Sequence, residues 1–109
     1  MAEILRVSPE EIYSQVKAGA SLLVCAYDNE ETCRSMRLEG AVSLGEFKTQ
    51  VSQVPKDQEI IFYCAWNHEH SSAGQAAEYQ AQGYSNAKAL LGGVASWKQA
   101  GLPIIPAAA

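Results

Sequence analysis

Cys64 stands between an apolar run at residues 60–63 and a polar segment that ends at Ser71-Ser72. The run predicts a buried strand, and the alanine-rich stretch after Ser72 predicts a helix. A thiol between the carboxyl end of a strand and a helix N-terminus faces unpaired N–H groups and the positive end of the helix dipole. Both favour the thiolate, the reactive form of cysteine, whereas a free thiol with a pKa of about 8.5 is mostly protonated at pH 7. The sequence therefore predicts a nucleophilic cysteine in an anion-accepting loop.

The segment after Cys64 supplies the other candidate site residues, whose backbone N–H groups are expected to do most of the binding. They are Ala65, Trp66, Asn67, His68, Glu69, His70 and Ser71. His68 and His70 are expected to be solvated, with a direct part in anion binding as the alternative. Trp66 is expected to pin the loop by packing, or alternatively to present a contact surface to a donor or acceptor protein.

A zinc site is a further hypothesis for the same segment. Cys64, His68 and His70 are competent ligands, but their spacing matches no common structural site and no fourth ligand is evident. The sequence therefore predicts neither a metal nor a cofactor.

The composition is that of a globular chain: 48% of its 109 residues are hydrophobic. The length predicts a single domain over residues 1–109, with a core at roughly residues 4–106 and a flexible C-terminal tail. Eight basic and twelve acidic residues give a net charge of −4, which argues against a nucleic-acid partner. No apolar stretch approaches the roughly 20 residues that a membrane span needs, and the N-terminus lacks a signal-peptide layout. No membrane partner is expected.

The three cysteines are Cys25, Cys33 and Cys64. An odd number without a C-x-x-C pair does not indicate a disulfide framework, and it suits a reducing cytoplasm. Cys25 is expected to be a small buried hydrophobe, with a role as a resolving thiol as the alternative. Cys33, in a polar stretch, fits either a buried or a reactive role. Only Cys64 has a position that indicates chemistry.

Strands and helices are expected to alternate along the chain. Strands are predicted at residues 4–7, 22–26, 41–44, 59–63 and 87–91. Helices are predicted after Ser8, at residues 29–36 and 47–54, from Ser71 to Gly83, and around Trp97. This order predicts an α/β fold, an open parallel sheet of about five strands with helices on both faces and right-handed crossovers. Ligands of such sheets bind beyond the carboxyl ends of the strands, where Cys64 is placed.

Three finer features carry expectations of their own. Ser8, Pro9 and Glu11 predict an N-cap, a proline at the first helical position and a capping box. Small side chains predict a narrow face on the helix after Cys64, formed by Ala73, Ala76, Ala77 and Ala81. Residues 102–106 predict an extended tail.

Over roughly residues 4–106 the chain resembles single-domain rhodanese-like sulfurtransferases. One matching stretch is the strand–Cys64–loop–helix unit, with Ser72-Ala73 opening the helix, and another is the turn Leu38-Glu39-Gly40-Ala41. The third runs from Gly83-Tyr84 through Gly92-Gly93 and Trp97-Lys98 to Ala100-Gly101-Leu102-Pro103. The order and spacing of these stretches make the resemblance specific.

The resemblance implies a mechanism of two half-reactions. Cys64 would take sulfane sulfur from a donor such as thiosulfate or a persulfide, hold it as a persulfide, and pass it to cyanide or a cellular thiol. Loop N–H groups and the helix dipole would stabilise the negative charge. The implied partners are a small-molecule donor and acceptor, with a sulfur-relay protein as a further candidate. The implied location is the cytoplasm.

Two departures from the family pattern leave alternatives open. The loop has eight positions, from Cys64 through Ser71, where relatives have six, and it contains no glycine, arginine or lysine. A wider, less basic loop makes thiosulfate a poorer donor. Relatives have an acidic and a basic residue that support the loop at the position of Cys25-Ala26-Tyr27, and both are absent here. Apolar packing is expected to support this region instead.

Two other functions fit the same fold. Phosphatases and arsenate reductases related to rhodaneses have a longer loop, but they clamp phosphate with an arginine where this chain has His70. A non-catalytic module that senses persulfides or binds a partner protein is the other alternative.

Overall fold

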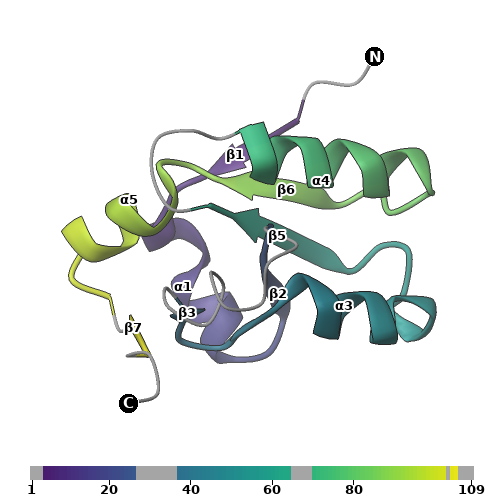
Figure 1. Cartoon of the computed structure of the whole chain (residues 1–109). Coiled ribbons are helices and arrows are strands. Elements are labelled where there is room, and N and C mark those ends of the chain that lie inside the picture. Colours follow the sequence, from purple (N-terminus) through teal and green to yellow (C-terminus); the bar gives the residue numbers. More distant parts are fainter. Residues whose placement is uncertain (1–3, 27–36, 65–69, 103, 106–109) are drawn as a thin grey trace.

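The computed structural model describes residues 4–26, 37–64, 70–102 and 104–105, and five of its strands form one parallel sheet (Figure 1). In chain order the strands are β1 (Arg6–Val7), β2 (Ser21–Cys25), β4 (Ala41–Val42), β5 (Glu59–Tyr63) and β6 (Ala87–Leu90). Their order in the sheet is β1-β6-β5-β2-β4, so β5 is the central strand. The described helices are α1 (Pro9–Lys17), α3 (Leu44–Gln50), α4 (His70–Ala81) and α5 (Gly93–Gln99), with a 3₁₀ turn, η1 (Val51–Gln53), after α3. The predicted open parallel α/β sheet is confirmed.

Each face of the sheet is covered by a pair of helices. One buried layer contains residues of α1 and α5: Ile12, Val16, Val94 and Trp97. The other contains residues of α3 and α4: Leu44, Phe47, Ala76 and Tyr79. Along β5, Ile61 and Tyr63 join the α1/α5 layer, whereas Ile60 and Phe62 join the α3/α4 layer. Burial on both faces explains why β5 is a continuous apolar run in the sequence.

Capping boxes set the starts of two helices. The predicted box at α1 is confirmed: the Ser8 hydroxyl accepts the Glu11 N–H at 3.3 Å, and the Glu11 carboxylate reaches back to Ser8. A second box starts α3, where the Ser43 hydroxyl accepts the Glu46 N–H at 3.1 Å. The predicted strand at residues 41–44 is therefore too long, because Leu44 is already the first residue of α3.

The buried face of α4 differs from the predicted alanine face. Ser72, Ala76 and Tyr79 are buried, whereas Ala77 and Ala81 are exposed. Residues at positions i, i+4 and i+7 lie on one side of a helix, and here that side combines a serine, a small residue and an aromatic ring. The predicted alanine face was wrong because it was based on side-chain size alone and not on which side of the helix faces the sheet.

The extended segment near the C-terminus pairs with a distant strand. Strand β7 (Ile104–Ile105) runs antiparallel to β3 (Arg37–Leu38), with Leu38 opposite Ile104. This pairing of segments far apart in sequence was not predicted. The helix expected at residues 29–36 and the last four residues lie outside the described residues.

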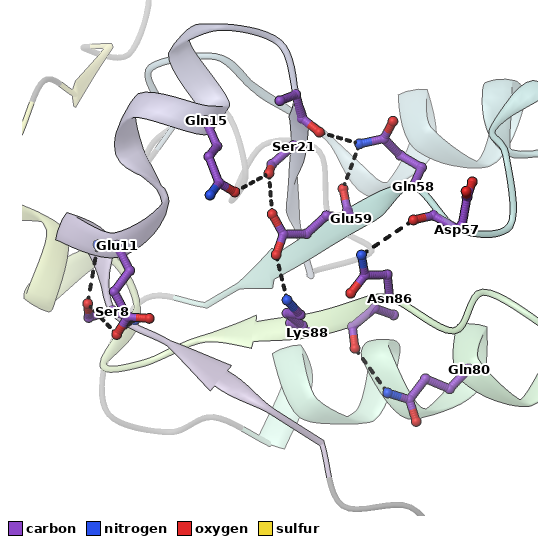
Figure 2. A network of polar contacts seen from close by, with 12 residues as sticks. Ser8, Glu11, Gln15, Ser21, Asp57, Gln58, Glu59, Gln80, Asn86 and Lys88 are labelled. Carbon is purple, nitrogen blue, oxygen red and sulfur yellow. Dashed lines mark hydrogen bonds and ion pairs between the residues drawn. The ribbon is translucent and has the colours of Figure 1, made fainter.

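A polar network lies at the amino-terminal ends of β2 and β5, on the side covered by α1 (Figure 2). Ser21 hydrogen-bonds the Glu59 carboxylate and lies 3.1 Å from Oε1 of Gln15 on α1. Lys88 Nζ donates to Glu59 Oε2 at 2.6 Å, and both side chains are mostly buried. Burial alone would raise the pKa of Glu59, but the hydrogen bonds from Lys88 and Ser21 and the Lys88 charge outweigh it. The pKa of Glu59 is therefore below its ordinary value of 4.5.

Glycine is required at the start of α5. Gly92 caps this helix with a φ of +78°, and a Cβ added there would lie 2.6 Å from the Cβ of Ser96. Gly101, just after the same helix, has a φ of +75° with nothing within 4 Å of an added Cβ. The two positions share the left-handed backbone and differ in space for a side chain.

The network predicts how stability depends on pH. A carboxylate whose pKa is lower in the folded state than in the unfolded state stabilises the fold at pH values above its unfolded-state pKa. This contribution is lost as pH falls through the pKa of the folded state. Glu59→Gln should lower the free energy of unfolding at pH 7 by about 1–2 kcal/mol. This loss lies between that expected for an exposed ion pair and that for breaking a fully buried one. The difference from wild type, measured by urea unfolding, should shrink below pH 4.5. The exposed Glu78→Gln is the control, and a difference that stays constant down to pH 3 would contradict the assignment.

The two glycines provide a matched pair of variants. Gly101→Ala should cost about 1–2 kcal/mol of unfolding free energy through left-handed backbone strain alone. Gly92→Ala should cost about 1–3 kcal/mol more, because its methyl group also clashes with Ser96. Urea unfolding of both variants measures this difference, and equal losses would show that α5 shifts freely to accommodate the methyl group.

Candidate active site

The backbone around Cys64 is held by hydrogen bonds from two other elements. The Tyr63 carbonyl accepts the Ala26 N–H at 2.9 Å, just beyond the end of β2. The Cys64 carbonyl accepts the Val94 N–H at 2.8 Å, from the first turn of α5. Gly92 and Gly93, both with positive φ, turn the chain so that this N–H reaches Cys64. The position of Cys64 is therefore set by β2, β5 and α5 together.

The Cys64 sulfur faces α4. Its Sγ lies 3.9 Å from the Oγ of Ser72, and either atom can be the donor. Both residues have no exposed surface. The prediction of a thiol at the carboxyl end of a buried strand is confirmed. A thiol open at the mouth of the sheet is not what the structure shows, because Cys64 is covered.

Helix α4 begins six residues after Cys64. His70 and Ser71 form the start of the helix, and its first turn carries no acidic residue to oppose a bound anion. Figure 1 shows α4 lying along β5 and β6, so the N-terminus of α4 is at the edge of the sheet where β5 ends. The predicted strand–Cys64–helix arrangement is thereby confirmed at the level of the backbone.

Most of the predicted loop lies outside the described residues. This applies to Ala65, Trp66, Asn67, His68 and Glu69. The binding roles expected of them, and of the side chains of His70 and Ser71, stay predictions. Ser72, which the sequence analysis used only as a helix start, is a site residue that it missed. The sequence did offer a signal for Ser72. As the third residue of a helix that packs on the strand before Cys64, it could be expected to be buried near that strand.

Cys25 differs from its expected state. It is buried as predicted, at 1% exposure, but it is disulfide-bonded, whereas Cys64 is not in a disulfide. An odd number of cysteines excludes complete pairing and does not exclude one bridge, so the argument from number was wrong. Cys25 lies opposite Tyr63 in the β2–β5 register and belongs to the α1/α5 layer, whereas the Cys64 sulfur faces α4. The two sulfurs are therefore on opposite faces of the sheet. Cys33 lies outside the described residues.

The carboxyl of Glu59, whose pKa is lowered, lies at the opposite end of β5 from Cys64. Within residues 4–26, 37–64, 70–102 and 104–105, no three His, Cys, Asp or Glu side chains are grouped as metal ligands. Over these ranges no helix is long and apolar enough to cross a membrane.

Comparisons with known proteins agree with this geometry. The sequence matches the family model of the rhodanese-like domain over residues 8–100. A thiosulfate sulfurtransferase, GlpE, of Actinobacillus succinogenes is 31% identical over 103 residues, which cover 90% of this chain and 87% of that protein. A sulfurtransferase of Allochromatium vinosum is 35% identical over 57 residues, covering 51% of this chain and 50% of the relative, so this match spans half of each protein.

A solved structure from Rhodopseudomonas palustris has the same fold. It is described as a protein of unknown function and possible tyrosine phosphatase. It is 26% identical, with a TM-score of 0.72, and the match covers 94% of this chain and 85% of that one. With its five-stranded parallel sheet, its cysteine at the end of the central strand and these matches, the chain belongs to the rhodanese-like domain family.

Proposed function

We propose that this protein is a single-domain sulfurtransferase that carries sulfane sulfur as a persulfide on Cys64. The observation that supports it most strongly is a cysteine outside any disulfide, fixed at the carboxyl end of the central strand beside the N-terminal turn of α4. The membership of the rhodanese-like family and the sulfurtransferase names of two relatives favour the same activity.

The proposed reaction has two half-reactions. In the first, the Cys64 thiolate attacks the sulfane sulfur of thiosulfate, so that a new S–S bond forms while the old one breaks and sulfite leaves with its electron pair. In the second, an acceptor such as cyanide attacks the outer sulfur, giving thiocyanate and the Cys64 thiolate. N–H groups of the first turn of α4 and the loop before it, including Ala65 to Ser71, would bind the negative charge.

The burial of Cys64 sets a requirement on this proposal. A donor must reach a sulfur that has no exposed surface, so the protein must open locally before each transfer. The same burial favours the alternative of a non-catalytic module that binds a partner and uses Cys64 only for packing. Uptake of sulfur by the native protein separates the two.

The proposed partners are a small-molecule sulfur donor, a thiol or cyanide acceptor, and a sulfur-relay protein. The proposed location is the cytoplasm, where most thiols stay reduced. The disulfide at Cys25 is the observation that stands against this location. Rapid alkylation of a cell extract, followed by intact-mass measurement, decides whether Cys25 is reduced in the cell.

The persulfide can be detected directly by intact mass. Native protein incubated with thiosulfate, or with a low-molecular-weight persulfide, should gain one sulfur atom, and cyanide should remove it as thiocyanate. Cys64→Ser should gain none. The disulfide at Cys25 leaves Cys64 as the reacting thiol among the described residues. A wild-type protein that gains no sulfur from either donor would contradict the proposal.

A phosphatase is the second candidate, favoured by the similarity to the structure from R. palustris. Phosphatases of this fold clamp phosphate with a bidentate arginine, and this chain has His70 at that position. We therefore expect no hydrolysis of para-nitrophenyl phosphate above the level of Cys64→Ser. Hydrolysis by wild-type protein that is lost in Cys64→Ser would reverse the ranking of the two functions.

A further inference from the structure

We propose that Ser72 is a further catalytic residue, whose hydroxyl donates a hydrogen bond to the Cys64 sulfur when that sulfur is released as a thiolate. The inference deepens the proposed function, because it assigns a role within the persulfide cycle to a residue outside the Cys64 loop.

The contact between the two side chains is built into the core. Ser72 Oγ lies 3.9 Å from Cys64 Sγ, and both residues are completely buried. Ser72 shares the inward side of α4 with Ala76 and Tyr79, which pack on the sheet. A buried hydroxyl costs free energy unless it is hydrogen-bonded, and the Cys64 sulfur is one partner within reach of Ser72 Oγ.

The geometry is held from both sides. Cys64 is fixed through its carbonyl by the Val94 N–H, and the preceding carbonyl by the Ala26 N–H. Ser72 is fixed by the packing of α4 on β5 and β6. The hydroxyl is therefore already beside the sulfur before charge develops there.

The charge on the Cys64 sulfur differs between the two half-reactions. Thiolate sulfur accepts a hydrogen bond more strongly than neutral sulfur, because a charge on one partner roughly doubles the strength of a hydrogen bond. In the first half-reaction the thiolate loses its charge as it attacks, so the bond weakens on the way to the transition state. In the second, the acceptor attacks the outer sulfur, the S–S bond breaks, and its electron pair returns to Cys64. The bond to Ser72 then strengthens in the transition state, which accelerates this step.

The two half-reactions can be timed separately. Protein loaded with thiosulfate, freed of donor and mixed with cyanide, should release thiocyanate about ten-fold more slowly in Ser72→Ala than in wild type. Loading by thiosulfate should change by less than this factor. Ser72→Thr keeps the hydroxyl and should restore the rate of release. A merely structural role for Ser72 would slow both steps alike or neither.

Ser21→Ala is the matched control, because Ser21 and Ser72 are the two buried serines among the described residues. Ser21 bonds Glu59 at the far end of β5, so its loss should lower stability and leave the ratio of the two rates unchanged. Urea unfolding of each variant identifies any that fails to fold.

A second measurement does not depend on sulfur transfer. Methyl methanethiosulfonate converts the Cys64 thiol to a methyl disulfide with loss of methanesulfinate. Dithiothreitol then attacks the methyl-bearing sulfur, forming a mixed disulfide with it and releasing the Cys64 thiolate. This release, followed by intact mass, should be slower in Ser72→Ala and restored in Ser72→Thr. If wild type gains no sulfane sulfur but Ser72→Ala still slows this release, the proposed function fails and the role of Ser72 stands. Equal rates of release from wild type and Ser72→Ala would overturn the role of Ser72. A wild-type Cys64 that reacts with neither thiosulfate nor methyl methanethiosulfonate would overturn it as well.

Discussion

Two backbone hydrogen bonds hold the segment on which the whole site depends. The Ala26 N–H binds the carbonyl of Tyr63, and the Val94 N–H binds the carbonyl of Cys64. The first continues the β2–β5 ladder past the end of the strand, and the second brings α5 against the same point. Because a buried carbonyl must be paired, losing either bond would cost free energy as well as position. The Cys64 side chain is consequently directed at α4, where the hydroxyl of Ser72 meets it.

The two ends of the central strand differ in the groups that they carry. At the amino-terminal end of β5, Glu59 is paired with Lys88 and Ser21 in a network that ties β2, β5, β6 and α1 together. At the carboxyl end, Cys64 lies beside Ser72, with the start of α4 nearby. The charged contacts that stabilise the sheet are thereby kept a full strand length, roughly 16 Å, from the sulfur. An anionic donor would then meet the partial positive charge at the start of α4.

The individual elements and the parallel sheet implied by their order could be predicted, whereas particular contacts between distant residues could not. The span of β5 and the capping box of Ser8 and Glu11 follow from local pattern, and the structure confirms both. The box at Ser43 was equally local and was overlooked, which made one strand too long. The pairing of β3 with β7 and the bonded state of Cys25 depend on residues brought together only by folding. Ser72 belongs to the same class, because its contact with Cys64 needs the angle at which α4 packs on the sheet.

The decisive experiment is a structure of the protein determined after loading with thiosulfate. We expect one added sulfur bonded to Cys64 Sγ, directed toward the first-turn N–H groups of α4, with the Val94–Cys64 hydrogen bond kept. An unmodified Cys64 in protein that has been exposed to excess donor would contradict it, and so would an added sulfur that points away from α4.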